Sequence, residues 1–138
     1  MSTPSPPGAT VYVETSAVAK LLVPEAESAA LAEYLNAAAD EDARLVSSML
    51  TETETRRLAV REELDQTDVT DVLDGFELVE LARSTYHAAG VLPGRAPRSL
   101  DALHVAVALR VDADVFVAYD RRQCDAARAA GLVVDSPT

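Results

Sequence analysis

The stretch VFVAYDRRQCDAARAAGLVV, residues 115–134, decides the fold class. It begins with a short run of β-branched and aromatic residues, continues with a helical pattern that Gly131 ends, and finishes with a second β-branched run. A strand followed by a crossover helix and another strand pairs the two strands in parallel. The sequence therefore predicts an α/β protein.

The same alternation of strands and helices runs through the rest of the chain. Strands are predicted at 11–13, 45–48, 76–81, 115–119 and 132–134. Helices are predicted at 17–23, 27–40, 49–64, 66–74, 84–89, 99–111 and 121–130, with Ser99 as an N-cap. These elements predict a three-layer α/β/α sandwich around a mainly parallel sheet of about five strands.

The length of 138 residues suits a single domain, which we expect to span residues 10–138. Residues 1–9 are rich in Pro and Ser and are predicted to be a disordered or extended lead. No apolar run approaches the ~18 residues that a membrane span needs, and the polar start lacks the layout of a secretory signal. We expect a cytoplasmic protein without membrane contact.

The charge balance restricts any contact with nucleic acid. A net charge of −11 excludes broad electrostatic sliding on nucleic acid, so such contact must be local. The cations are eleven arginines and one lysine, Lys20, and several arginines flank acidic residues: Arg56, Arg57, Arg61, Arg95, Arg98, Arg121 and Arg122. They could form a rim that clamps phosphate, or they could be solvated helix faces and ion pairs. The single cysteine, Cys124, lies in an ordinary amphipathic helical pattern and cannot form an internal disulfide.

Four acidic residues stand where a predicted strand ends or a predicted helix begins: Glu14, Glu54, Asp101 and Asp120. In open α/β sheets, ligands gather beyond the carboxyl ends of the strands, so these acids should converge. Two carboxylates ~5 Å apart repel by about 3 kcal/mol at an effective dielectric of ~20, so four must take up protons or bind a cation. Mg²⁺ prefers oxygen ligands and substrate phosphates. The acids therefore predict a magnesium site for phosphate-ester chemistry.

Each acid taken alone has a simpler explanation. Glu14 and Asp120 could stabilise the N-termini of the helices that follow them. Thr51 and Glu54 have the T-x-x-E spacing of a capping box, in which the glutamate only returns to the backbone. Four such coincidences are less probable than one shared site.

Asp101 carries a sharper signal than the other acids. It falls in the first turn of an otherwise apolar helix, where an acid is costly unless it is paired or bound to metal. His104 follows one turn later, and a lone histidine there is more often a polar helix residue than a ligand.

Four segments, in this order, resemble the PIN-domain proteins, especially VapC-type toxins of bacterial toxin–antitoxin pairs: VYVETSAVAKLLVPE, LVSSMLTETETRR, RSLDALHVAVAL and VFVAYDRRQCDAARAAGLVV. The likeness extends from Val11 to Val134. It implies an endoribonuclease dependent on Mg²⁺, or on Mn²⁺ as a substitute, that cleaves cellular RNA such as tRNA or rRNA. It also implies a homodimer that a small VapB-like antitoxin silences by filling the acidic pocket.

The motif alignment assigns the four acids of the family to Glu14, Glu54, Asp101 and Asp120. The first acid is commonly Asp, and Glu14 adds ~1.5 Å of reach, which puts metal choice and turnover in question. We hypothesise that Glu14, Asp101 and Asp120 hold one or two ions while Glu54 orients the attacking water, leaving a 5′-phosphate and a 3′-hydroxyl. Thr15 or Ser16 should orient Glu14. Substrate contacts are expected from Arg98, Arg121 and Arg122.

Two rival functions are open at this point. A response-regulator receiver also binds Mg²⁺ with acids at strand ends, but it normally has a lysine after its last strands, and here only Lys20 exists. The second rival is a catalytically weak PIN domain that acts by binding RNA or a partner protein.

Overall fold

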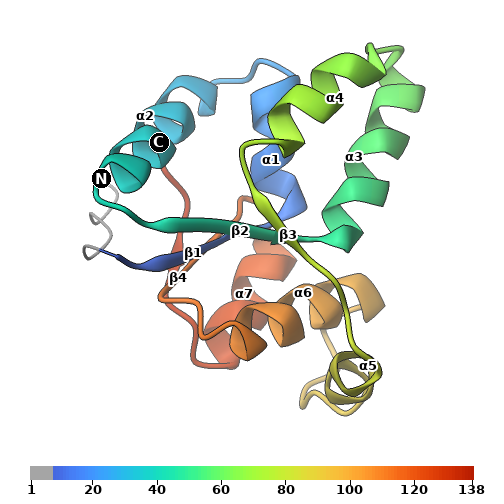
Figure 1. Cartoon of the computed structure of the whole chain (residues 1–138). Helices are drawn as coiled ribbons and strands as arrows, with labels where there is room; N and C mark the ends of the chain where they lie inside the picture. Colours follow the sequence, from blue (N-terminus) through green and yellow to red (C-terminus); the bar gives the residue numbers. More distant parts are fainter. Residues whose placement is uncertain (1–7) are drawn as a thin grey trace.

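The computed structural model describes residues 8–138 (Figure 1). Residues 1–7, most of the predicted lead, lie outside the described residues. Gly8 and Ala9 already contact the domain, since the Gly8 amide donates to the carbonyl of Glu41 at 3.0 Å and the Ala9 carbonyl accepts from the Arg44 amide at 2.8 Å.

The sheet has five strands and is parallel at every pairing within residues 8–138. The strands are β1 Thr10–Val13, β2 Arg44–Ser48, β3 Glu77–Val79, β4 Val115–Val117 and β5 Val134–Asp135. Their order is β3-β2-β1-β4-β5, so the first strand along the chain occupies the centre. The predicted parallel α/β sheet is confirmed.

Helices cover both faces of this sheet, as Figure 1 shows. The described helices are α1 Thr15–Leu22, α2 Ser28–Asp40, α3 Met49–Glu62, α4 Gln66–Leu73, α5 Arg83–Gly90, α6 Ser99–Arg110 and α7 Arg121–Ala129. Helices α1 to α4 pack on one face, and α6 and α7 pack on the other with α5 against α6. The predicted three-layer sandwich is confirmed.

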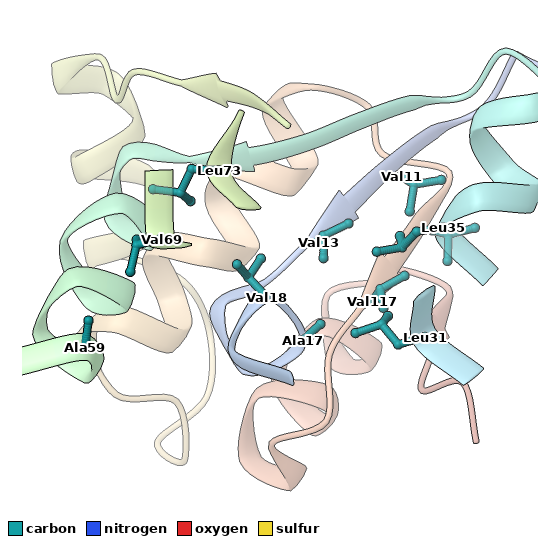
Figure 2. Close-up of a cluster of buried hydrophobic side chains, with 11 residues drawn as sticks. Val11, Val13, Ala17, Val18, Leu31, Leu35, Ala59, Val69, Leu73 and Val117 are labelled. Carbon is teal, nitrogen blue, oxygen red and sulfur yellow. The ribbon is translucent and has the colours of Figure 1, made fainter. Parts of the chain in front are cut away.

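The alternation of side chains along the central strands divides the core in two. Val11 and Val13 point to the α1–α4 side, where they join Val18, Leu31 and other buried residues (Figure 2). Tyr12 points to the opposite side and stacks on Phe116, with ring centroids 5.3 Å apart. The period of two along a strand thus places one aromatic residue under α6.

Three predicted details differ from the structure. Strand β3 is a three-residue edge strand with one exposed and two part-buried residues, whereas the sequence predicted a longer strand, 76–81, on the core side. Strand β5 begins at Val134 rather than at residue 132. Ser99 is already helical, and the N-cap of α6 is Arg98, whose amide is bound by the Asp101 carboxylate at 3.0 Å.

The strand order creates a switch point beside β1. The chain moves outward from β1 to β2 and β3, then crosses back so that β4 pairs with the other side of β1. Ligands of open α/β sheets bind at the carboxyl ends of strands at such a point. A receiver-like fold has the order 2-1-3-4-5, so this sheet does not match that rival.

Candidate active site

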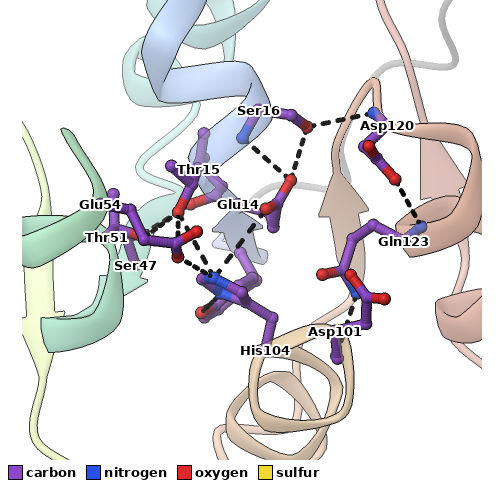
Figure 3. Close-up of polar contacts among 12 residues, drawn as sticks. Glu14, Thr15, Ser16, Ser47, Thr51, Glu54, Asp101, His104, Asp120 and Gln123 are labelled. Carbon is purple, nitrogen blue, oxygen red and sulfur yellow. Dashed lines mark hydrogen bonds and ion pairs between the residues drawn. The ribbon is translucent and has the colours of Figure 1, made fainter. Parts of the chain in front are cut away.

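An open cleft with a volume of ≈ 1270 Å³ lies at the carboxyl ends of β1 and β4. All four predicted acids line it: Glu14, Glu54, Asp101 and Asp120. Figure 3 shows that they come from the β1–α1 junction, α3, α6 and the start of α7. The expected convergence of four distant segments is therefore what the fold produces.

Glu14 is the N-cap of α1 and is buried at the end of the central strand. Its Oε1 atom accepts from the Ser16 amide at 3.0 Å and from the Ser16 hydroxyl at 2.5 Å. Burial raises the pKa of the Glu14 carboxyl above its usual range, against the lowering effects of His104 and Ser16. Ser16, rather than Thr15, is the residue that contacts the Glu14 carboxylate.

Glu54 extends from α3 toward the same cleft. Its Oε1 atom accepts from the Thr15 hydroxyl at 2.8 Å and lies 2.8 Å from Nε2 of His104. The capping-box explanation is wrong, because α3 begins after Ser48 and Thr51 is a buried residue inside the helix. Glu54 is thus free of the backbone role that its spacing suggested.

His104 joins two elements that sequence reasoning did not connect. It is buried on α6, and its Nδ1 lies 2.7 Å from the Tyr12 hydroxyl while its Nε2 contacts Glu54. A carboxylate can only accept, so Nε2 carries the proton that it shares with Glu54. Burial raises the pKa of Tyr12, so its hydroxyl stays protonated where it hydrogen-bonds with Nδ1 of His104.

The same histidine nitrogen also lies 3.9 Å from Oε2 of Glu14, so it stands between two of the four acids. The interpretation of His104 as an ordinary polar helix residue missed these contacts. The available signal was its position three residues after Asp101, which places both side chains on one helix face.

Asp101 occupies the first turn of α6 and is buried, as its apolar helix suggested. Its Oδ2 atom accepts from the Arg98 amide at 3.0 Å and from Nε of Arg122 at 2.9 Å. Gln123 also donates to the Asp101 backbone carbonyl at 3.1 Å. The cost of burying this acid is offset by an arginine and by a helix N-terminus.

Asp120 is the exposed N-cap of α7, and its Oδ1 atom accepts from the Gln123 amide at 3.0 Å. The turn before it is tied to Ser16, whose hydroxyl oxygen accepts from the amides of Tyr119 at 2.8 Å and Asp120 at 3.2 Å. Ser16 therefore connects the Glu14 side of the cleft with the Asp120 side.

The four carboxylates share one pattern of hydrogen bonding. In each, one oxygen is held by protein donors, while within residues 8–138 the other has no hydrogen-bond donor. Carboxylate oxygens that accept no hydrogen bond from the protein are hard ligands of the kind that Mg²⁺ and Mn²⁺ take, so the donor set fits a divalent cation. In the described part of the chain, no three His, Cys, Asp or Glu side chains are already grouped closely enough to hold a metal ion. The site has the right chemistry but is not preassembled as a closed cage.

The arginines divide between two surfaces. Arg57, Arg61, Arg98 and Arg122 line the acidic cleft. Arg56 instead pairs with Glu52 and contacts Gln66 and Thr70, so it is a structural residue. Arg95 and Arg121 line a neighbouring hollow, which Arg122 shares. The predicted rim is therefore real for part of the set, and Arg121 lies outside the cleft.

A model of the PIN domain family matches residues 11–129, nearly the whole chain. The chain belongs to the PIN-domain family. Ribonuclease VapC35 of Mycobacterium tuberculosis is 38% identical over 136 residues, which cover 92% of this PIN domain and 96% of that protein. Ribonuclease VapC47 of the same species is 32% identical over 133 residues, with 92% and 96% covered.

Solved structures show the same fold at low identity. The VapBC2 complex of Rickettsia felis, bound to a DNA fragment from its promoter, contains a chain with a TM-score of 0.74 and 14% identity, covering 93% of this PIN domain and 99% of that chain. VapC20 of Mycobacterium tuberculosis, described as a toxin that cleaves the sarcin–ricin loop, gives a TM-score of 0.71 at 19% identity, with 92% and 99% covered.

Two residues singled out by the sequence lie outside the acidic cleft of this PIN domain. Lys20 donates to Glu25 and Glu27 and lies over the Tyr119 ring, with Nζ 4.8 Å from the centroid, so it cannot serve a receiver-like site. Cys124 is buried, and burial raises the pKa of its thiol, as expected for a structural cysteine. Within residues 8–138, no helix is both long and apolar enough to cross a membrane.

Proposed function

We propose that this PIN domain is a VapC-type toxin, an endoribonuclease that cleaves phosphodiester bonds of cellular RNA in the cytoplasm. The observation that carries the proposal is the set of four carboxylates in one cleft, each anchored through one oxygen and offering the other. Relatives that cover almost the whole chain are named ribonucleases, which supports the same activity.

The acids Glu14, Asp101 and Asp120 would hold Mg²⁺ or Mn²⁺ through their second oxygens. When bound, such an ion activates water at neutral pH and neutralises charge on the phosphate. Glu54 accepts a hydrogen bond from the attacking water through Oε2 and orients it. Arg98 and Arg122, beside Asp101, bind the phosphate oxygens of the substrate.

His104 is a positioning residue in this scheme rather than a base. Both of its ring nitrogens are already engaged, one by Tyr12 and one by Glu54. It fixes Glu54 Oε1, and Thr15 fixes the same atom from the opposite element. The free Oε2 atom is then held in one orientation toward the cleft.

Two protein partners complete the proposal. Large apolar side chains are exposed at the cleft, namely Met49 at 40%, Tyr86 at 53% and Leu100 at 48%. Such side chains beside a functional cleft suit a contact with a second copy of the chain. A VapB-like antitoxin would silence the enzyme by filling the acidic cleft with a basic tail, because opposite charges are attracted there.

The test combines cleavage with metal titration. The protein is freed of metal with a chelator and incubated with end-labelled RNA in Mg²⁺, in Mn²⁺ and without metal, and calorimetry measures binding of each ion. Cleavage that needs a divalent ion and leaves 5′-phosphate ends supports the proposal. Tight RNA binding without cleavage in either metal would instead identify a binding module, the alternative that the lengthened Glu14 side chain keeps open.

A further inference from the structure

A second hollow of ≈ 790 Å³ lies beside the acidic cleft, between the loop at residues 91–98 and helix α7. We call it the arginine groove and define it by Leu92, Arg95, Leu109, Arg121, Arg122 and Ala129. Its volume falls within the ~300–1,000 Å³ of small-molecule sites, which is room for a nucleotide-sized group.

The floor of the arginine groove is small and apolar. It is lined by Ala126 and Ala129 of α7, by the C-cap residue Ala130, and by Leu92 and Leu109. A floor of small side chains leaves space for a flat group, and the faces of nucleobases are flat and weakly polar. Arginine guanidinium groups can stack on such a group as well as bind its phosphate.

The arginines that line the groove favour binding of an anion. Within residues 8–138, Arg95 and Arg121 form no hydrogen bond or ion pair, and Arg122 uses only Nε, which donates to Asp101. The one acid of the lining, Asp125, lies 3.6 Å from Nη1 of Arg128. Arginines without partners are notable in a chain of net charge −11, and they face a floor suited to an apolar group. A nucleotide has both an anionic phosphate, which the arginines can bind, and a flat base, which the apolar floor can accommodate.

The arginine groove adjoins the acidic cleft, because Arg122 lines both. A nucleic acid strand whose phosphate lies at the acids would run on into the groove. An acidic peptide would match the charge, but nothing requires it to occupy both places at once. The position of the groove beside the acids therefore favours the substrate over a protein partner.

We propose that the arginine groove binds an unpaired nucleotide of the RNA substrate, next to the phosphodiester bond that is cleaved. This inference rests on the proposed ribonuclease function and narrows its substrate class. In a duplex the base faces are stacked on their neighbours, so only an unpaired segment offers a face to the floor. The new element is the place in the fold, the arginine groove, that would hold this unpaired nucleotide.

The experiment measures binding of fluorescent RNA to Glu54→Gln protein. This variant is used as the background because it blocks RNA cleavage, and Glu54 does not line the arginine groove. Single-stranded RNA and the same RNA annealed to its complement are compared by fluorescence anisotropy over a salt series. The groove variants are Arg95→Gln with Arg121→Gln, and separately Ala129→Glu, which places a carboxylate on an exposed α7 position. Arg83→Gln on α5 is the matched control for lost charge, since it lines neither hollow.

We expect the double arginine variant to weaken binding of single-stranded RNA about tenfold or more. The slope of log affinity against log salt should fall by about 1.4, because two phosphate contacts of ~0.7 each are lost. Ala129→Glu should weaken binding as well, Arg83→Gln should not, and the duplex should bind the parent protein less tightly than the single strand. In the active protein, KM for RNA should rise more than kcat falls.

Three outcomes distinguish the groove assignment from the proposed ribonuclease function on which it rests. If the wild-type chain cleaves RNA and both groove variants bind RNA as the parent does, the groove assignment is wrong and the ribonuclease stands. If the groove variants lose RNA binding but the wild-type chain cleaves nothing in Mg²⁺ or Mn²⁺, the groove stands and the enzyme does not. If RNA binding is kept and binding of a co-expressed antitoxin is lost, the groove is a protein site and the inference is overturned. Thermal melting confirms that each variant is folded.

Discussion

The two halves of the acidic cleft are built in different ways. Glu14 and Glu54 meet across a single histidine nitrogen, and that histidine is fixed in turn by Tyr12. Asp101 and Asp120 are instead held by local contacts at the start of α6 and α7, with Arg122 as the one side chain added. The first half depends on side chains far apart in sequence, and the second on helix caps.

This difference implies that the halves respond differently to mutation. We expect the carboxylates held by local caps to keep their positions when distant elements are mutated. We expect the histidine-centred half to lose its arrangement when one of its side chains is removed. The predictions below test that contrast, beginning with the largest expected effect.

Asp101→Asn should reduce RNA cleavage by about 100-fold or more, because losing a metal ligand costs several kcal/mol of transition-state stabilisation. The melting temperature without metal should change little, because the asparagine oxygen can still accept from the Arg98 amide while the ion pair with Arg122 becomes a weaker neutral hydrogen bond. Cleavage of labelled RNA in Mg²⁺ and thermal melting are the measurements. Asp71→Asn, an exposed acid on α4, is the control. If Asp101→Asn cleaves RNA at the wild-type rate, the acids are helix caps only.

His104→Leu should lower cleavage about 10- to 100-fold, and His104→Gln should retain more activity. Glutamine keeps an N–H group that can reach Glu54, whereas leucine leaves the part-buried Glu54 carboxylate with one donor fewer. The comparison uses kcat and the concentration of Mg²⁺ at half-maximal rate. Equal activities in the two variants, at equal melting temperatures, would mean that His104 only fills space.

Ser16→Ala should lower cleavage about tenfold and destabilise the fold by about 1–3 kcal/mol. The hydroxyl donates to Glu14 and accepts two amides near Asp120, so its loss loosens the link between the two halves. Thr15→Val should cost less, because it removes a donor from Glu54 alone. Chemical denaturation and initial rates decide the order, and a larger loss in Thr15→Val would contradict it.

Glu14→Gln should stabilise the metal-free protein at neutral pH. The folded protein holds the Glu14 proton more tightly than the unfolded chain, since burial raises this pKa above its ordinary value of 4.5. The contribution to stability is therefore complete below pH 4.5 and is lost as pH rises through the folded pKa. Melting curves of both proteins from pH 4 to 8 should separate as pH increases. A variant less stable than the parent at pH 8 would disprove the assignment of cause.

The sequence predicted the parts of the site that follow from local pattern. Asp101 in an apolar helix, and Glu14 and Asp120 after buried strands, could be placed because strand ends and helix starts are readable in sequence. The same holds for the parallel sheet and its layers. Edge strands β3 and β5 were misplaced, because pairing on one side only gives a weak pattern in sequence.

The contacts of the histidine-centred half could not be predicted from local sequence patterns. Tyr12 and His104 are 92 residues apart, and their contact exists only because β1 and α6 pack together. Nothing local marks Tyr12 as different from a core aromatic residue. The T-x-x-E spacing at Glu54 pointed to a cap, and the tertiary contact with His104 overrode it.

The central position of β1 has a consequence for how the protein is made. Among the five strands of residues 8–138, β1 leaves the ribosome first, yet its pairing with β4 joins residues about one hundred positions apart. Contacts of such separation form late and slowly in folding. The nascent chain therefore lacks both the pairing of β1 with β4 and its fourth carboxylate until translation has passed Asp120, so no nuclease site can form before that point.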